Sequence, residues 1–324
     1  MKNFSKIGGW LTFILFTSAM ISCSVGGNVN GHSGDNPPAD DDVADDDTVD
    51  DDIADDDSAD DDTDDGAWLS PGCSGVPGAG GSFQGSMVSA GYERTYILDV
   101  PASYSGLPVA LVVNLHGTGA TAAEQKALSR FSEKGEEEGF IAVYPESLEY
   151  ESDAKVKSWF IGNCDNRDVT FIADLLDRIE SDYCIDKRQV HVTGISNGAY
   201  FTHILGAVFG SEIASIGPVA GGLGPVGKLC DPVRQMPAVI IHGDADDVVP
   251  VEKGREARDF WVAFNKCSTS IPDSNGCILY TDCTDDAEVL YCEIVGGVHW
   301  WPHGDFEATD VIWSFFEEHT ISAD

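Results

Sequence analysis

The sequence has few basic residues: 18 Lys and Arg stand against 56 Asp and Glu, which gives a formal net charge of −38 over 324 residues. No stretch of the chain gathers its lysines and arginines into a basic run. Proteins that bind nucleic acids present positively charged surfaces to the phosphate backbone. The composition therefore argues against a nucleic acid as partner.

The apolar run near the N-terminus covers only residues 10–21, whereas a membrane-spanning helix needs about 20 apolar residues. Two lysines precede this run, and a charged start before a short apolar run is typical of a secretory signal peptide, here residues 1–22. Residues 20–23 resemble a bacterial lipobox, so Cys23 is predicted to be the lipidated N-terminus of the mature protein. A plain signal peptide cleaved nearby is the alternative. Both predict an extracytoplasmic protein. The first places it at the bacterial cell surface, where it meets the membrane only through its lipid anchor, and the second makes it a secreted protein.

Five pentads between residues 39 and 63 each carry three consecutive aspartates and show no apolar periodicity. Such a segment repels itself and cannot bury a core, so residues 23–66 are predicted to form an extended, disordered spacer. The tract lacks the alternating Asp-x-Asp-x-Asp-Gly pattern of calcium-binding loops, which argues against a calcium site. With 18 aspartates and two lysines, residues 1–66 carry a net charge of −16. The predicted catalytic domain, residues 67–324, holds the remaining −22.

Although the chain has nine cysteines, it contains no C-x-x-C pair, which argues against a zinc site. Cysteines in an exported chain imply disulfide bonds. Setting Cys23 aside for the lipid leaves eight, for which 105 pairings are open. Four of them fall within residues 267–292 and are predicted to staple a loop-rich insertion. The eight are Cys73, Cys164, Cys184, Cys230, Cys267, Cys277, Cys283 and Cys292.

Three polar residues each follow an apolar, strand-like stretch. Ser196 lies in Gly194-Ile195-Ser196-Asn197-Gly198, before a helix-like stretch that runs to about residue 209. This strand, tight turn and helix are the context that a nucleophile elbow requires. Asp246 and His299 follow two later strands, and the order nucleophile, acid, histidine is that of α/β-hydrolases. The preceding apolar stretches are residues 189–193, 238–241 and 289–295.

The three residues are predicted to act together. Ser196 would be the nucleophile and His299 the base that removes its proton, because a serine hydroxyl is a poor nucleophile at neutral pH. Asp246 would hold the imidazole tautomer and stabilise its cation. The developing oxyanion would meet the backbone N–H of Asn197 and a second N–H, that of Thr118.

Other residues compete for these roles. Asp244 and Asp247 are alternatives to Asp246, and His303 is an alternative base. A metal site formed by His299 and His303 is disfavoured because Pro302 breaks the helix that would align them. Four other histidines are predicted to be structural, packed or on the surface. They are His116, His191, His203 and His242.

Strand-like and helix-like stretches alternate through the catalytic domain, which predicts an α/β fold with a doubly wound, mostly parallel sheet and helices on both faces. The predicted strands are residues 92–98, 109–115, 140–144, 189–193, 213–219, 238–241 and 289–295. The predicted helices are residues 121–135, one that begins at 168, one that runs to about 209, 252–264 and 306–319.

From about residue 73 to 319 the chain resembles a group of secreted α/β-hydrolase esterases that includes feruloyl esterases, acetylxylan esterases and polyhydroxybutyrate depolymerase-like proteins. The resemblance favours Asp246 as the acid, and it is strongest to the feruloyl-esterase branch over the cysteine-rich segment. The segments that carry it are His116-Gly117, Asp168–Phe171, Cys184–Asp186, Gly194–Gly198, Pro218–Gly221, His242–Pro250, Asn265–Thr269 with Cys292, and Gly297–Pro302.

The resemblance implies a serine carboxylesterase that removes feruloyl or acetyl groups from xylan, with a short-chain polyester depolymerase as the alternative. A catalytically inactive surface binding protein on the same scaffold is the alternative of another class. Trp159 and Trp300 are predicted to form an aromatic wall for the substrate, although a place in the core is the competing interpretation for such aromatics. No cofactor and no metal are expected. The expected partner is an ester-substituted polysaccharide or a polyester, bound by a monomer.

Overall fold

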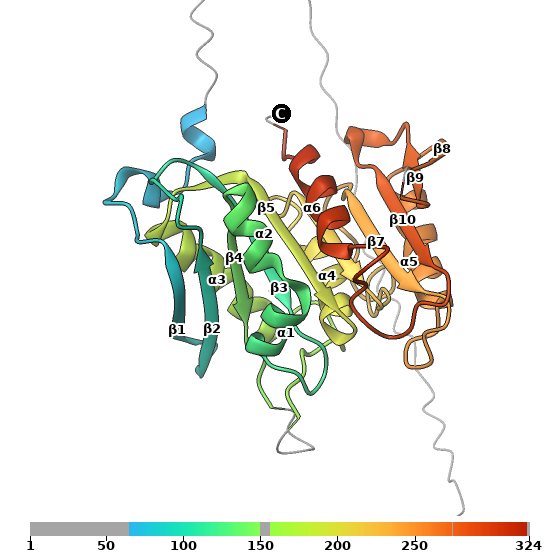
Figure 1. Ribbon diagram of the computed structural model, residues 1–324, viewed down its shortest axis with the longest axis horizontal. Helices are drawn as coiled ribbons and strands as arrows, with labels where there is room; N and C mark the ends of the chain where they lie inside the picture. The colour runs from blue at the N-terminus through green and yellow to red at the C-terminus, as the bar shows by residue number, and fades with distance from the viewer. Residues whose placement is uncertain (1–64, 150–155, 274, 323–324) are drawn as a thin grey trace, which may run out of the picture. The chain divides into compact units, whose positions relative to one another are not determined.

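A computed structural model describes residues 65–149, 156–273 and 275–322. The predicted signal peptide, the lipidated Cys23 and nearly all of the acidic spacer lie outside these ranges. The described part is built on one ten-stranded sheet with the order β1-β2-β4-β3-β5-β6-β7-β10-β9-β8 (Figure 1).

The strands are β1 (Gly81–Ser89), β2 (Tyr92–Val100), β3 (Val109–Leu115), β4 (Ile141–Pro145), β5 (Ile185–Ile195), β6 (Ser215–Val219), β7 (Ala238–Gly243), β8 (Thr269–Pro272), β9 (Ile278–Thr281) and β10 (Val289–Ile294). The helices are α1 (Ala122–Ser129), α2 (Phe131–Glu138), α3 (Arg167–Asp182), α4 (Asn197–Val208), α5 (Glu252–Phe264) and α6 (Ala308–Glu318). Three short 3-10 helices are η1 (Asp65–Trp68), η2 (Pro71–Ser74) and η3 (Thr284–Asp286).

The centre of the sheet, from β4 through β3, β5, β6 and β7 to β10, is parallel. Antiparallel pairs extend it at both edges, β1 and β2 at one and β9 and β8 at the other. In Figure 1, α1, α2 and α6 lie in front of the sheet and the other three helices behind it. The predicted mostly parallel, doubly wound α/β fold is therefore confirmed.

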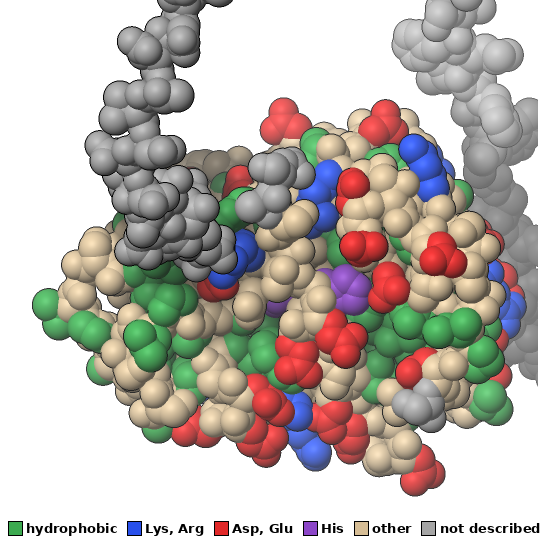
Figure 2. Space-filling view, turned by 90° about the horizontal axis from the view of Figure 1, so that it is seen from above, with side chains coloured by type: hydrophobic (Ala, Val, Ile, Leu, Met, Phe, Trp, Pro, Cys, Tyr) green, Lys and Arg blue, Asp and Glu red, His purple; other side chains and the backbone are tan. Residues whose placement is uncertain are grey.

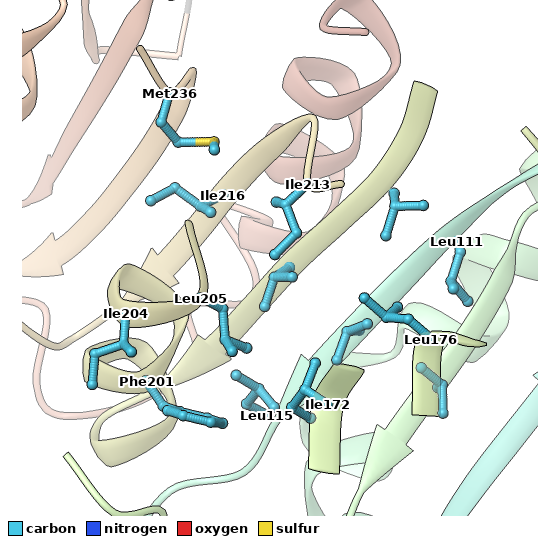
Figure 3. Packing of buried hydrophobic residues seen from close by; sticks show 14 of the residues in the cluster. Leu111, Leu115, Ile172, Leu176, Phe201, Ile204, Leu205, Ile213, Ile216 and Met236 are labelled. Atoms are coloured by element: carbon cyan, nitrogen blue, oxygen red, sulfur yellow. The ribbon is translucent and has the colours of Figure 1, made fainter. Parts of the chain in front are cut away.

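Side chains of β3 alternate between two buried clusters, because successive residues of a strand point to opposite faces of the sheet. Leu111 and Leu115 join the cluster under α3, α4 and α5, whereas Val112 joins the cluster under α1, α2 and α6. In Figure 3, Leu111 and Leu115 lie among side chains from α3 and α4, including Ile172 and Phe201. A strand buried on both faces reads as a continuous apolar run, which is why β3 could be predicted from its sequence.

Arg130 divides the single helix predicted over residues 121–135 into α1 and α2. Its φ of 56° lies in the left-handed region, where it ends α1 and precedes α2. A continuous helix would turn Phe131 away from the face that buries Ser129, since neighbours on one helix face are three or four residues apart. The break instead brings Phe131 into the core against Phe140 and Trp301.

Four disulfides pair all eight cysteines of the predicted catalytic domain. They are Cys73–Cys184, Cys164–Cys230, Cys267–Cys283 and Cys277–Cys292. The two last pairs confirm that the cysteines of residues 267–292 staple their own segment. That segment forms the β8–β9 hairpin, which the sequence patterns did not predict. Disulfides are typical of proteins that mature outside the cytoplasm.

Acidic side chains are scattered widely over the face shown in Figure 2, where lysines and arginines are few. This matches the strongly negative net charge and leaves that face without a basic patch. Within the described ranges, no helix is long and apolar enough to cross a membrane.

A buried ion pair joins β2 to the start of α3. Arg94 donates from Nη1 to Asp168 Oδ1 at 2.8 Å, and both side chains are almost completely buried. The other carboxylate oxygen of Asp168 accepts from the N–H of Phe160 at 2.8 Å. The Arg94 guanidinium also lies 3.9 Å above the centre of the Phe171 ring. The pair therefore ties three separate segments together.

We expect Asp168→Ala to lower the free energy of unfolding by about 3–5 kcal/mol, because it leaves the buried charge of Arg94 without a partner. Urea unfolding with the disulfides intact measures this. Asp182→Ala is the matched control, since it breaks the exposed Arg178–Asp182 pair and should cost less than about 1 kcal/mol. Equal, small losses in the two variants would contradict the prediction.

Candidate active site

Ser196 occupies the tight turn between β5 and α4. Its φ of 57° and ψ of −120° are strained for a residue with a side chain, and its N–H donates to Val219 O at 2.9 Å. The neighbouring glycines are required sterically. A Cβ on Gly194 would lie 2.7 Å from the Cβ of Leu115, and one on Gly198 would collide with the carbonyl of the same leucine. The Gly-x-Ser-x-Gly pattern thus packs the elbow against the end of β3.

Asp246 and His299 lie in the loops that follow the neighbouring parallel strands β7 and β10. His299 Nδ1 is 2.7 Å from Asp246 Oδ2. The two loops pack backbone to backbone, because a Cβ on Gly243 would collide with the main chain of Gly297. The N–H of Ala245 also donates to Gly297 O at 2.9 Å. Residues 53 positions apart in the sequence are held together by this contact.

The Asp246 carboxylate is surrounded by donors. Oδ1 accepts from the N–H groups of Val248 at 2.9 Å and Val249 at 2.8 Å. Oδ2 lies 3.3 Å from His242 Nε2, which also contacts Val249 O at 2.8 Å. Burial alone raises the pKa of Asp246, but the hydrogen bonds from His299, Val249 and Val248 outweigh it and hold that pKa below its ordinary value. Asp246 is therefore ionised at neutral pH.

Neither competing acid contacts His299, and the competing base has other partners. Asp244 Oδ1 accepts from the N–H of Gly296 at 2.6 Å, and Asp247 is exposed to solvent. His303 is held by Leu128 O, 2.7 Å from Nε2, and by the carboxylate of Glu307, 2.9 Å from Nδ1. Of the acids and bases considered, Asp246 and His299 are the pair in contact.

The other histidines have structural surroundings. His116 is buried, with Nδ1 2.8 Å from Gly117 O, and its Nε2 accepts from Ser147 N–H at 3.1 Å. Burial lowers the pKa values of His191 and His203 to about 3, so both rings stay neutral. No cluster of metal-ligating side chains occurs in the part of the chain that the structure describes.

Ser196 and His299 line the same cavity of about 650 Å³. One wall comes from α1, through residues such as Gln125 and Leu128, which no motif in the sequence indicated. Trp300 also lines the cavity and is 58% exposed.

The expectation that Trp159 forms part of this wall is wrong. Its side chain is 1% exposed and does not line the cavity. The ring stacks on Phe201 with 5.0 Å between centroids, and Nε1 donates to His116 O at 3.0 Å. A buried indole gains both from ring packing and from a partner for its N–H, and Trp159 has both in the core.

The N–H groups of Asn197 and Thr118 donate no hydrogen bond to any residue placed by the structure. Asn197 is the first residue of α4, and the N–H groups in the first turn of a helix have no partner within the helix. Thr118 follows Gly117, at which a Cβ would lie 3.3 Å from the Cβ of Ser196. Two unpaired donors therefore belong to segments that meet at Ser196.

Residues 94–226, which include Ser196, match the family described as esterase PHB depolymerase. Three curated relatives are a poly(3-hydroxyalkanoate) depolymerase C of Paucimonas lemoignei, with 34% identity over 36% of this chain and 30% of that protein, and two esterases of Emericella nidulans. One of the two Emericella nidulans esterases is feruloyl esterase C, with 29% identity over 32% of this chain and 38% of that protein. The other is acetylxylan esterase A, with 30% identity over 39% of this chain and 43% of that protein. The matches span less than half the length of each relative.

Solved structures show the same fold. An acetyl xylan esterase from Aspergillus awamori matches with a TM-score of 0.59 and 17% identity, over 74% of this chain and 99% of that chain. A thermostable esterase matches with a TM-score of 0.56 and 20% identity, over 74% of this chain and 63% of that one. The α/β-hydrolase fold and the resemblance to this esterase group, both predicted from the sequence, are confirmed.

Proposed function

We propose, from this relationship to the esterase PHB depolymerase family, that the protein is a serine carboxylesterase with Ser196, His299 and Asp246 as its catalytic residues. The observation that carries the proposal is the hydrogen-bonded pair His299–Asp246 at a cavity that Ser196 also lines. All three lie after the carboxyl ends of parallel strands, where open α/β sheets bind their ligands.

In the first half of the reaction, His299 Nε2 takes the hydroxyl proton of Ser196 while Oγ attacks the carbonyl carbon of the ester. The N–H groups of Asn197 and Thr118 stabilise the oxyanion of the tetrahedral intermediate. The intermediate collapses as the imidazolium returns the proton to the leaving alcohol, and an acyl-enzyme remains.

In the second half, His299 takes a proton from water, and the resulting hydroxide attacks the acyl carbon. Collapse of the second intermediate releases the carboxylic acid and restores the Ser196 hydroxyl. Throughout both halves, Asp246 accepts from Nδ1–H and so keeps Nε2 pointing toward the serine. The ionised state of Asp246 favours the imidazolium form of His299.

The proposed substrates are feruloyl or acetyl esters on xylan. The exposed ring of Trp300 at the cavity offers a face on which a phenolic acid or a sugar stacks. Relatives named feruloyl esterase and acetylxylan esterase also support this substrate class. The second candidate is a short-chain polyester, favoured by the depolymerase among the relatives. The four disulfides, with the predicted signal peptide and the Cys23 anchor, support action outside the cytoplasm at the cell surface.

The test compares methyl ferulate with p-nitrophenyl acetate as substrates of the full chain. We expect kcat/KM for methyl ferulate to be at least comparable to that for p-nitrophenyl acetate. Trp300→Ala should lower kcat/KM for the ferulate about fivefold, because one ring contact is worth about 1 kcal/mol, and should lower kcat/KM for the acetate less. Acetate cleavage without ferulate release would instead favour acetylxylan or a polyester. If neither ester is hydrolysed, the chain is an inactive scaffold and the proposal fails.

A further inference from the structure

We propose that Ser158 is a positioning residue that holds the two oxyanion donors, the N–H groups of Thr118 and Asn197, in a fixed relation to one another. The inference rests on the proposed esterase function. The observation behind it is a row of hydrogen-bonded side chains that links the two residues carrying these donors. Thr118 Oγ1 is 3.1 Å from Ser158 Oγ, which is itself 3.1 Å from Asn197 Oδ1.

The donor and acceptor in each of these hydrogen bonds follow from which atoms carry a hydrogen. The N–H of Trp159 can only donate, and it lies 2.7 Å from Asn197 Oδ1, which is therefore an acceptor. Ser158 must then use its one hydroxyl hydrogen to donate to the same oxygen. Thr118 Oγ1 in turn donates to Ser158 Oγ. The three side chains form one directed chain, with Ser158 as the member that both donates and accepts.

The loop that carries Thr118 has little stiffness of its own. It lies between Gly117 and Gly119, the second with a φ of 78°, and Thr118 itself is exposed. A residue with a side chain would restrict the backbone at position 117, but its Cβ would crowd the Cβ of Ser196. Glycine has the widest backbone freedom, so the position of the Thr118 N–H depends on contacts from outside the loop.

Those contacts come from residues 157–159. The N–H of Gly119 donates to Lys157 O at 2.8 Å, next to the link between Thr118 and Ser158. The same segment holds the elbow, because Asn197 Nδ2 donates to Trp159 O at 3.2 Å and Asn197 Oδ1 accepts from the N–H of Trp159. One short segment therefore contacts both residues that carry the donors.

The segment is itself firmly anchored. Trp159 is buried against Phe201 and bonded to His116 O, as described above. The N–H of Ser158 donates to Leu148 O at 3.2 Å, and Lys157 forms an ion pair with Glu146. Residues 157–159 thus serve as a rigid support for a flexible loop, and Ser158 is the side chain that passes this rigidity to Thr118.

An oxyanion exists only in the transition state and the intermediate, so a loosened donor should slow the chemical step without weakening substrate binding. Removing one such donor outright costs about 10²–10³-fold in kcat. Loosening it should cost less. For Ser158→Ala we expect kcat to fall about tenfold with KM unchanged, and Ser158→Thr, which keeps the hydroxyl, to restore most of the loss.

The experiment measures kcat, KM, the melting temperature and inhibition by an alkyl boronic acid. A boronic acid adds to the serine and places an oxygen where the oxyanion forms, so Ser158→Ala should raise its inhibition constant about as much as it lowers kcat. Thr118→Val removes the same link from its other end and should give the same pattern, which covers the case in which Ser158→Ala folds poorly. Ser74→Ala, an exposed serine bonded to Pro71 O, is the control expected to behave as wild type.

An unchanged kcat in Ser158→Ala and Thr118→Val would overturn the inference and leave the esterase proposal standing. A higher KM at unchanged kcat would also overturn it, because Ser158 would then contribute to substrate binding. If the wild-type chain shows no Ser196-dependent turnover, the proposed function fails and the inference fails with it. These results are distinguishable because the first two require an active wild-type enzyme.

Discussion

Ser196→Ala is expected to lower kcat/KM for ester hydrolysis by at least about 10⁴-fold, because the substrate carbonyl then has no hydroxyl to attack it. Residual activity would come from the oxyanion donors and the cavity, which the substitution leaves in place. The measurement is steady-state hydrolysis of p-nitrophenyl acetate, with covalent labelling by a serine-directed fluorophosphonate as a second readout. Labelling should disappear together with turnover.

Two controls separate the loss of the nucleophile from a loss of the fold. Ser86→Ala changes an exposed serine on the edge strand β1 and should retain wild-type activity. Ser196→Gly should be as inactive as Ser196→Ala but melt at a higher temperature, because glycine adopts the strained backbone of the elbow at little cost. Substantial turnover by Ser196→Ala would show that another residue is the nucleophile.

Asp246→Asn is expected to lower kcat/KM by about 10⁴-fold. An asparagine amide can donate to Nδ1 and so stabilise the wrong tautomer of His299, and it removes the negative charge that favours the imidazolium. The pKa of Asp246 is held below its ordinary value, so the stability that this carboxylate contributes is present above about pH 4 and is lost as the pH falls through its folded pKa. The variant should lose this part of the acid dependence of urea unfolding.

Asp244→Asn and Asp247→Asn are the matched controls for this prediction. Asp244 contacts the N–H of Gly296, and Asp247 is exposed, so each variant should lose less than about tenfold in kcat/KM. His303→Gln tests the alternative base in the same assay and should remain active. A large loss in either aspartate variant, with Asp246→Asn active, would move the acid to a different residue.

Elements with strong local patterns could be predicted from the sequence. The continuous apolar run of β3 placed that strand at its observed bounds, Val109–Leu115, and the helix predicted over residues 252–264 coincides with α5, Glu252–Phe264. Strand β1 was missed because its residues are mostly exposed and include several glycines and serines, which have little strand propensity. It is held by pairing with β2, a contact between segments that no local pattern reports.

In the candidate site, too, some residues could be predicted from their local sequence and others could not. Ser196, Asp246 and His299 each lie in a local context that indicates their role. No residue next to Trp159 in the sequence indicates that its side chain is buried, because the burial depends on Phe201, which is distant in the sequence. Ser158 likewise has partners 39 and 40 residues away and no motif of its own. The disulfide pairing could not be deduced either, because it depends on which segments the sheet brings together.

The contact between Gly243 and Gly297 has an evolutionary consequence. Because neither position has room for a side chain, a substitution at one cannot be rescued by a smaller residue at the other, and the two loops that carry the acid and the histidine must keep this crossing as they diverge. Variation can accumulate instead at neighbouring residues that point outward, such as Val248, Val295 and Val298. Libraries that vary these two loops should therefore leave both glycines untouched.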